Sequence, residues 1–72
     1  MSVTAVQEVE TRAKHALRNS PFYELRGLDV EPAEGRLLIS GSVSSFYYKQ
    51  LAQEVVRAVC REVEVVNSIH VR

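Results

Sequence analysis

Apolar residues in the first quarter of the chain recur at the spacing of an amphipathic helix. Between positions 4 and 18 they are Val6, Val9, Ala13, Ala16 and Leu17. This spacing places them on one stripe of a helix with 3.6 residues per turn. Pro21 disfavours the helical conformation at Ser20, so we expect the helix to end before it.

The middle of the chain alternates between apolar and polar positions, as strands with one buried face do. Leu28 and Val30 predict a short first strand that ends at Pro32, because proline cannot donate to a ladder. A turn over residues 33–35 leads into a second, antiparallel strand. One face of this strand carries Leu37, Ile39, Gly41 and Val43. Gly41 leaves a gap on that face, where we expect a helix to lie close to the sheet.

A second helical stripe follows, and a third alternating segment runs to the end of the sequence. The stripe consists of Tyr48, Leu51, Ala52, Val55, Ala58 and Val59. The last segment carries Val63, Val65, Ile69 and Val71, with Asn67 between them. The order α-β-β-α-β predicts an α+β fold in which both helices pack on one face of a three-stranded sheet. The second and third strands are joined by a helix, so we expect them to run parallel. They lie either side by side or with the first strand between them, and we favour the side-by-side arrangement in a mixed sheet.

Size and composition point to a module that relies on a partner. The 72 residues are expected to form a single domain over positions 1–72. A domain this small removes only about 60 % of its unfolded surface from water. We therefore expect a protein partner, a neighbouring domain or a second copy in a homodimer. The single Cys60 excludes an internal disulfide, and His15 and His70 have no matching ligand cluster, so no metal or other cofactor is expected.

Charge and hydropathy exclude several functions. Nine basic and nine acidic residues give zero net charge, which argues against general nucleic-acid binding. No apolar run reaches the 18 residues of a transmembrane helix. Acidic residues near the start interrupt any signal-peptide core, so the chain either stays inside the cell or comes from a longer protein. No polar groups converge in a catalytic pattern, and we expect neither catalytic residues nor enzymatic activity.

The stretch EGRLLISGSVSSFYYKQLAQEVVRAV, residues 34–59, resembles the core of the BON domain, named for bacterial osmotic-stress and nodulation proteins. Gly35, Gly41 and Val43 fit the family pattern of glycine, apolar strand, glycine and valine. The ending VVNSIHV fits a V-x-N-x-I-x-V strand through Asn67, and LDV fits the first strand. The pair at positions 61–62 departs from the family, which usually has glycine and an apolar residue there.

This resemblance implies a module without catalytic activity that occurs mostly in bacterial envelope or membrane-associated proteins. The expected function is protein–protein or domain–domain contact, in the periplasm or envelope. The alternative is binding to a phospholipid surface, which the family is also proposed to do. A remote alternative is RNA binding, because the order α-β-β-α-β also occurs in one form of the KH fold. That fold needs a GxxG loop to clamp RNA, and this sequence has none.

Three adjacent aromatic residues, Phe46, Tyr47 and Tyr48, open the second helix, and one helix face cannot bury them all. Ser44 is the expected N-cap, and Tyr48 belongs to the apolar stripe. At 100° per residue, Tyr47 falls about 80° from the centre of the stripe and Phe46 about 180°. Phe46 therefore either folds back on a loop or forms, with Tyr47 and Lys49, an exposed contact patch for lipid or protein.

Two features of the predicted sheet add candidate residues. Leu38 and Val66 point to the face that no helix covers. They are either ordinary surface residues or, if their strands are adjacent, the seed of a dimer or domain contact. Asn67 has an inward position, and a buried amide without partners costs about 1–3 kcal/mol. We expect it to hydrogen-bond backbone near the loop that carries Arg61 and Glu62.

Overall fold

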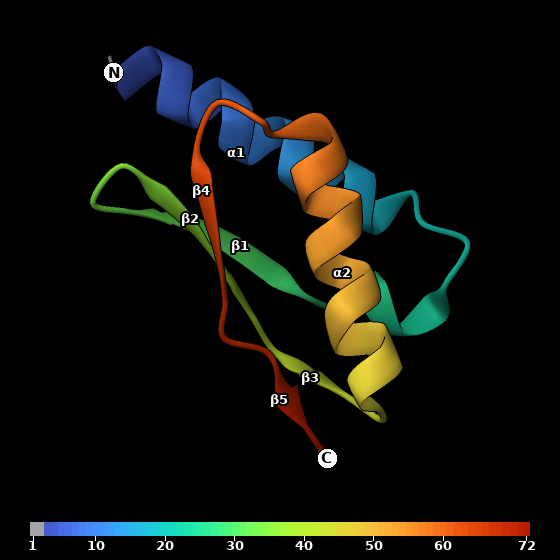
Figure 1. Cartoon of the computed structure of the whole chain (residues 1–72). Helices are drawn as coiled ribbons and strands as arrows, with labels where there is room; N and C mark the ends of the chain where they lie inside the picture. The colour runs from blue at the N-terminus through green and yellow to red at the C-terminus, as the bar shows by residue number, and fades with distance from the viewer. Residues whose placement is uncertain (1–2) are drawn as a thin grey trace.

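The computed structural model describes residues 3–72, and the side chains of residues 8–72. Its elements are α1 (Val3–Arg18), the 3-10 helix η1 (Tyr23–Leu25), β1 (Asp29–Ala33), β2 (Arg36–Ser40), β3 (Ser42–Val43), α2 (Phe46–Val59), β4 (Glu64–Asn67) and β5 (His70–Val71). The predicted order α-β-β-α-β is confirmed (Figure 1). The second and third predicted strands are each interrupted once, and η1 is an addition that the sequence patterns did not predict.

The sheet has the order β1-β2-β4, with β1 antiparallel and β4 parallel to the central strand β2. The parallel, side-by-side arrangement of the second and third predicted strands is therefore confirmed. Beyond the two interruptions, β3 and β5 form a separate parallel pair. Amide-to-carbonyl bonds from Ser68 to Ile39 and from His70 to Gly41 continue the ladder of β2 and β4 into the pair formed by β3 and β5.

The first strand extends beyond Pro32, where the sequence predicted its end. β1 continues through Pro32 to Ala33, which pairs with Arg36. Because β1 is an edge strand, a residue without an N–H can be accommodated in it. The turn to β2 is formed by Glu34 and Gly35, whose φ angles are 53° and 80°. Two positive φ values in a two-residue turn match the right-handed twist of a hairpin, which explains the glycine at position 35.

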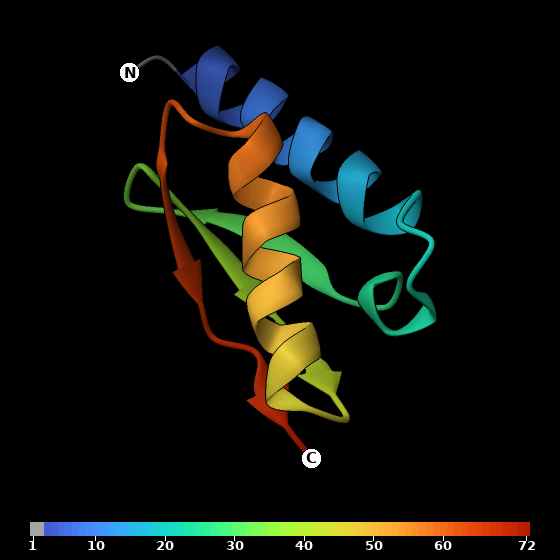
Figure 2. The same ribbon diagram turned by 45° about the vertical axis from the view of Figure 1, so that its right-hand side comes forward.

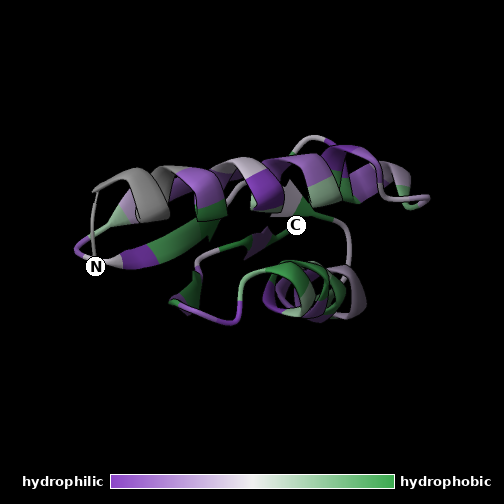
Figure 3. Cartoon of the chain, turned by 90° about the horizontal axis from the view of Figure 1, so that it is seen from above, coloured by the Kyte–Doolittle hydropathy of each residue, from purple (hydrophilic) through white to green (hydrophobic). Residues whose placement is uncertain are grey.

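Both helices cover the same face of the sheet, as predicted. One buried cluster joins residues of both helices to alternate residues of the strands. Its members include Val9, Ala13, Leu17, Val30, Leu37, Ile39, Ala52 and Val56. Figure 2 shows α2 lying along β4. In the same view α1 crosses behind the C-terminal end of α2. Figure 3 shows that α1 is largely hydrophilic on its outer side and that α2, seen end-on, is more hydrophobic.

The buried stripe of α2 differs from the predicted one. Val56 is fully buried, whereas Ala58 is exposed. Cys60 is also buried at the end of α2, where its thiol donates to the Val9 carbonyl at 3.3 Å. Burial raises the pKa of this thiol. Successive residues are about 100° apart around a helix. With Val56 and Cys60 buried and Ala58 exposed, the centre of the buried face of α2 therefore lies about 60° from the centre of the predicted stripe.

Gly41 makes room for a side chain rather than for a helix. A β-carbon built on Gly41 would lie 2.7 Å from Cδ2 of Leu28, the residue before β1. The φ angle of Gly41 is 130°, which side chains rarely adopt. The expectation of a helix close to this glycine was therefore wrong. The interruption between β2 and β3 is the place where Leu28 enters the core, and Val43 just beyond it is fully buried.

Candidate functional site

The aromatic residues of the chain lie on or beside two neighbouring elements. All five belong to η1, the residue before it, or the first turn of α2: Phe22, Tyr23, Phe46, Tyr47 and Tyr48. Three of them are well exposed, with exposed fractions of 83 % for Tyr23 and 61 % for both Phe46 and Tyr47. We call Tyr23, Phe46 and Tyr47 the aromatic end. They are the exposed large hydrophobic side chains among residues 8–72.

Helix α2 starts one residue later than expected. Ser45 is its N-cap, and its hydroxyl accepts a hydrogen bond from the Tyr48 amide at 3.4 Å. The predicted cap, Ser44, is engaged by Glu24 instead: its amide donates to Oε1 at 2.7 Å and its hydroxyl donates to Oε2. Phe46 therefore stands at the first position of a regular helix, and the alternative in which it folds back on a loop is wrong.

Tyr47 points away from the core more completely than the sequence indicated. Because the buried face of α2 is centred closer to Val56, Tyr47 lies about 140° from that centre and Phe46 about 120°. Tyr48 remains half-buried against the core. Its ring makes edge-to-face contacts with Tyr47 at a centroid distance of 5.4 Å and with Phe22 at 6.3 Å. Such pairs favour a fixed ring orientation, so Tyr48 holds Tyr47 in place.

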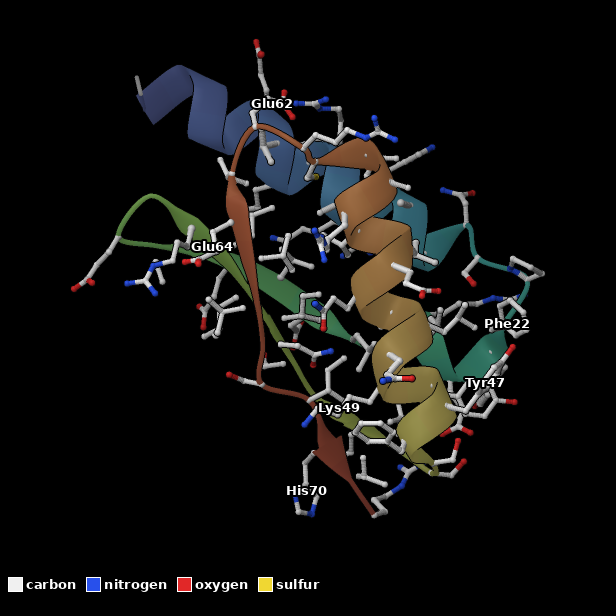
Figure 4. The ribbon with its side chains drawn as sticks, viewed as in Figure 1. Phe22, Tyr47, Lys49, Glu62, Glu64 and His70 are labelled. Atoms are coloured by element: carbon white, nitrogen blue, oxygen red, sulfur yellow. The ribbon has the colours of Figure 1, made fainter. Side chains whose placement is uncertain are left out.

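The predicted patch of Phe46, Tyr47 and Lys49 is assembled only in part. All three residues lie in the first turns of α2. Figure 4 shows Tyr47 on the flank that faces Phe22, whereas Lys49 lies on the opposite flank. Phe46 falls between them, about 60° from Lys49 and about 100° from Tyr47 around the helix. Lys49 is half-buried and has no ion pair with residues 8–72.

A carboxylate connects the elements that carry the exposed rings. Glu24 of η1 accepts both hydrogen bonds from Ser44, and the Arg72 guanidinium lies 3.0 Å from its Oε1. The Ser44 hydroxyl, followed by the Ser44 amide and Arg72, lowers the pKa of Glu24, with desolvation opposing this effect. One side chain thus joins η1, the start of α2 and the residue after β5. We refer to these contacts as the Glu24 clamp.

The outer face of the sheet brings Leu38 and Val66 together. They are direct neighbours in the register of β2 and β4, and both are half-buried. Glu31 is the partner of Leu38 on the other side. In the next row, Arg36 lies 3.4 Å from Glu64, which Figure 4 shows on β4. The adjacency of Leu38 and Val66 is as predicted, and their role in a dimer or domain contact remains a prediction.

Asn67 hydrogen-bonds backbone, but not at the predicted place. Its Nδ2 donates to the Lys49 carbonyl at 2.9 Å and to Gln53 Oε1 at 3.2 Å, and its Oδ1 accepts from the Ile69 amide at 3.1 Å. The parallel crossover sets the end of β4 against the start of α2, far from the loop at positions 61–62. Asn67 therefore fixes the sheet to the helix turn that carries Phe46.

The loop at positions 61–62 is held by α1 instead. Arg12 donates to the Val59 carbonyl at 3.0 Å and forms a hydrogen-bonded ion pair with Glu62. The Arg12 hydrogen bond lowers the pKa of Glu62. The motif change at Arg61 and Glu62 thus gives this chain a contact between the loop and α1.

The described side chains, those of residues 8–72, do not form a metal site. His15 and His70 are both exposed. Across residues 8–72, no three histidine, cysteine or acidic side chains gather in a way that would hold a metal ion. None of the described helices combines the length and apolar composition needed to cross a membrane.

Sequence reasoning missed Tyr23, the most exposed of the aromatic residues. Its position depends on η1, a three-residue element too short to give a periodic signal. The nearest clue was the clustering of all five aromatic residues between positions 22 and 48. That clustering does not tell which rings are exposed.

Comparison with known protein families gives one match over nearly the whole chain. The model of the BON domain matches residues 5–72, which extend from α1 through β5 to the last residue. No curated protein matches the chain.

Proposed function

Because the chain belongs to the BON domain family, whose members are generally non-catalytic modules often linked to membranes or envelopes, we propose that it is an interaction module. Its aromatic end docks onto another protein or a neighbouring domain. The observation that carries this proposal is the exposure of Tyr23, Phe46 and Tyr47 on adjoining elements. Aromatic side chains are enriched in protein interfaces, where a few of them supply most of the binding energy.

The way Tyr47 and the elements that carry the exposed rings are held supports the proposal. Tyr48 packs against Tyr47, and the Glu24 clamp fastens η1 to the start of α2. Side chains already held in place lose less conformational entropy on binding, so more of the contact energy appears as affinity. A rigid pair of elements with exposed rings therefore suits a folded partner surface.

The test is site-specific photo-crosslinking in cells that produce the protein. A photo-reactive phenylalanine analogue replaces Phe46 in one variant and His15, exposed on α1, in a matched control. We expect a discrete crosslinked protein from position 46 and not from position 15. The proposal is contradicted if position 46 gives no crosslinked protein, or if positions 46 and 15 give the same crosslinked proteins.

A phospholipid surface is the second candidate, favoured by the pairing of a ring with a cation. Phe46 and Lys49 lie on one flank of α2, and Lys49 has no ion pair with residues 8–72. Aromatic rings suit the boundary between headgroups and acyl chains, and anionic headgroups attract lysine.

Co-sedimentation with vesicles tests this candidate. Vesicles of phosphatidylcholine alone are compared with vesicles that also contain an anionic phospholipid. We expect stronger binding to the anionic vesicles, with losses for Phe46→Ser and Lys49→Glu but not for His15→Ser. Absence of binding to both vesicle types, or binding unchanged by Phe46→Ser, removes this candidate.

A further inference from the structure

Strand β4 is an edge of the sheet with free backbone groups. The strand order places β1 and β4 at the two edges (Figure 1). Both edge strands pack against a helix, β1 against α1 and β4 against α2. β1 carries Pro32, whereas β4 has no proline and no strand on its outer side within the described chain. An edge strand without a proline is open to pairing with a further strand.

The ladder determines which backbone groups of β4 are free. In a parallel pair, successive residues alternate between facing the neighbouring strand and facing away from it. Leu38 is the register partner of Val66, and the Ser68 amide donates to the Ile39 carbonyl at 2.9 Å. Val66 and Ser68 therefore face β2. It follows that the backbone N–H and C=O groups of Val65 and Asn67 point to the open side.

A groove runs beside this edge, between β4 and α2. Its volume is about 680 Å³, within the range of ligand-binding clefts. Its walls include Gln53, Arg57, Ala58, Arg61, Val63 and Val65. Val63 and Val65 are half-buried and form an apolar strip along the strand. Free backbone groups thus lie next to space for side chains.

The charges in the groove favour an acidic occupant. Arg57 and Arg61 are exposed and have no ion pair with residues 8–72. Two carboxylates also line the groove, but Glu64 is already paired with Arg36 at 3.4 Å. Glu54 alone then opposes the two arginines. An incoming carboxylate would meet a net positive wall.

We propose that the β4 edge and this groove bind an extended acidic segment of a partner protein as an added strand. The site is separate from the aromatic end and goes beyond the function proposed above. Main-chain hydrogen bonds to Val65 and Asn67 supply affinity, and the groove supplies side-chain selectivity.

The alternation of a strand specifies the pattern of the segment. In an antiparallel orientation, the ligand residues opposite Val63, Val65 and Asn67 point to the α2 side. The residue opposite Val65 meets the apolar strip and is apolar. The residue opposite Val63 lies nearest Arg61 and is acidic, while the one opposite Asn67 lies near Gln53 and is polar. The expected pattern is therefore polar-x-apolar-x-acidic.

A second copy of the chain fits this edge less well. Pairing of β4 with β4 about a two-fold axis would place the two α2 helices on the same face. Arg57 and Arg61 of each copy would then approach those of the other, and like charges across an interface oppose association. The acidic peptide meets the same arginines with the opposite charge.

The test is an NMR titration of the isotope-labelled chain with the blocked pentapeptide Thr-Thr-Val-Thr-Glu. We expect saturable shifts of the Val65 and Asn67 amides. Replacing the glutamate with lysine is expected to weaken binding by about tenfold. A peptide N-methylated at valine loses a main-chain donor and is expected not to bind.

Variants of the protein complete the test. Arg57 and Arg61 are exposed, so Arg57→Glu with Arg61→Glu should leave the fold intact and reverse the preference to the lysine peptide. Phe46→Ser with Tyr47→Ser should leave peptide binding unchanged, which separates this site from the aromatic end. The proposal is overturned by equal binding of both peptides, by shifts confined to the aromatic end, by no shifts at millimolar peptide, or by peptide-free dimerisation through β4.

Discussion

The side chain of Leu28 occupies the space beside Gly41 that a β-carbon at that position would need. The contact joins the residue before β1 to the interruption between β2 and β3. The three glycines of the chain differ in how strongly their surroundings oppose a β-carbon. Gly41 has both a close neighbour and a positive φ, Gly35 has a positive φ and open space, and Gly27 has open space without that constraint.

We predict that alanine substitutions will follow this ranking. Gly41→Ala should lower the free energy of unfolding by about 1–3 kcal/mol, because it combines backbone strain with displacement of Leu28. Gly35→Ala should cost about 1 kcal/mol from its conformation alone. Gly27→Ala is the matched control and should stay within about 0.5 kcal/mol of the parent. Urea unfolding measures all three, and a Gly41→Ala variant as stable as the Gly27→Ala control would refute the assignment.

Asn67→Ala should destabilise the domain by about 1–3 kcal/mol, because it leaves the Lys49 carbonyl and the Ile69 amide without this partner. Gln53→Ala removes only one acceptor of the Asn67 amide and should cost about 0.5 kcal/mol. Urea unfolding followed by circular dichroism provides both values. Equal losses for the two variants would show that the backbone bonds of Asn67 contribute little.

Acid stability should depend on the Glu24 clamp. The pKa of Glu24 is below its ordinary value of 4.5, chiefly through the hydrogen bond from the Ser44 hydroxyl. A carboxyl with a lowered folded-state pKa stabilises the fold above its unfolded pKa, and this contribution is lost as the pH falls through the folded pKa. The difference in melting temperature between the parent and Glu24→Gln should therefore be largest near neutral pH and shrink below about pH 4.

The matched control is Glu62→Gln, which removes the other carboxyl with a lowered pKa but leaves the clamp intact. It should retain the part of the pH dependence that comes from Glu24, and the double variant should lose both parts. A melting-temperature difference between the parent and Glu24→Gln that is constant from pH 3 to pH 7 contradicts the assignment.

If a second copy docks on the outer face of the sheet, Leu38→Lys should weaken the dimer by at least about tenfold. The new lysine would lie beside Glu31, so the folded monomer should be preserved. Sedimentation equilibrium up to millimolar concentration measures the effect, with Val66→Lys as a parallel variant. A parent chain that remains monomeric over this range contradicts a homodimer through Leu38 and Val66.

The elements with strong periodicity were predictable because burial on one face enforces the pattern. Val9, Ala13 and Leu17 identified α1, and the alternation through Leu37 and Ile39 identified β2. The parallel orientation of β2 and β4 followed from the connecting helix, whereas their adjacency was the favoured one of two arrangements. The helix and strand assignments depend on local spacing, which the sequence carries directly.

Features that depend on one long-range contact were not predictable. Ser44 and Ser45 are equally good caps, and Glu24 decides between them by binding Ser44. Likewise, the spacing on α2 allowed either Ala58 or Val56 to be buried, and packing against the other elements selects Val56. The exposure of Tyr47 follows from that choice, so its place in the candidate site could not be settled from the sequence.

The parallel pairing of β2 with β4 has a consequence for how the chain folds. The whole of α2 lies between these strands, so their ladder closes only after a long, entropically costly loop has formed. The hairpin of β1 and β2 closes over a two-residue turn and has no such barrier. We therefore expect the hairpin of β1 and β2 to form before the β2–β4 ladder, and the docking of α2 with β4 to be the slow step. The folding rate should be lower than that of a purely helical bundle.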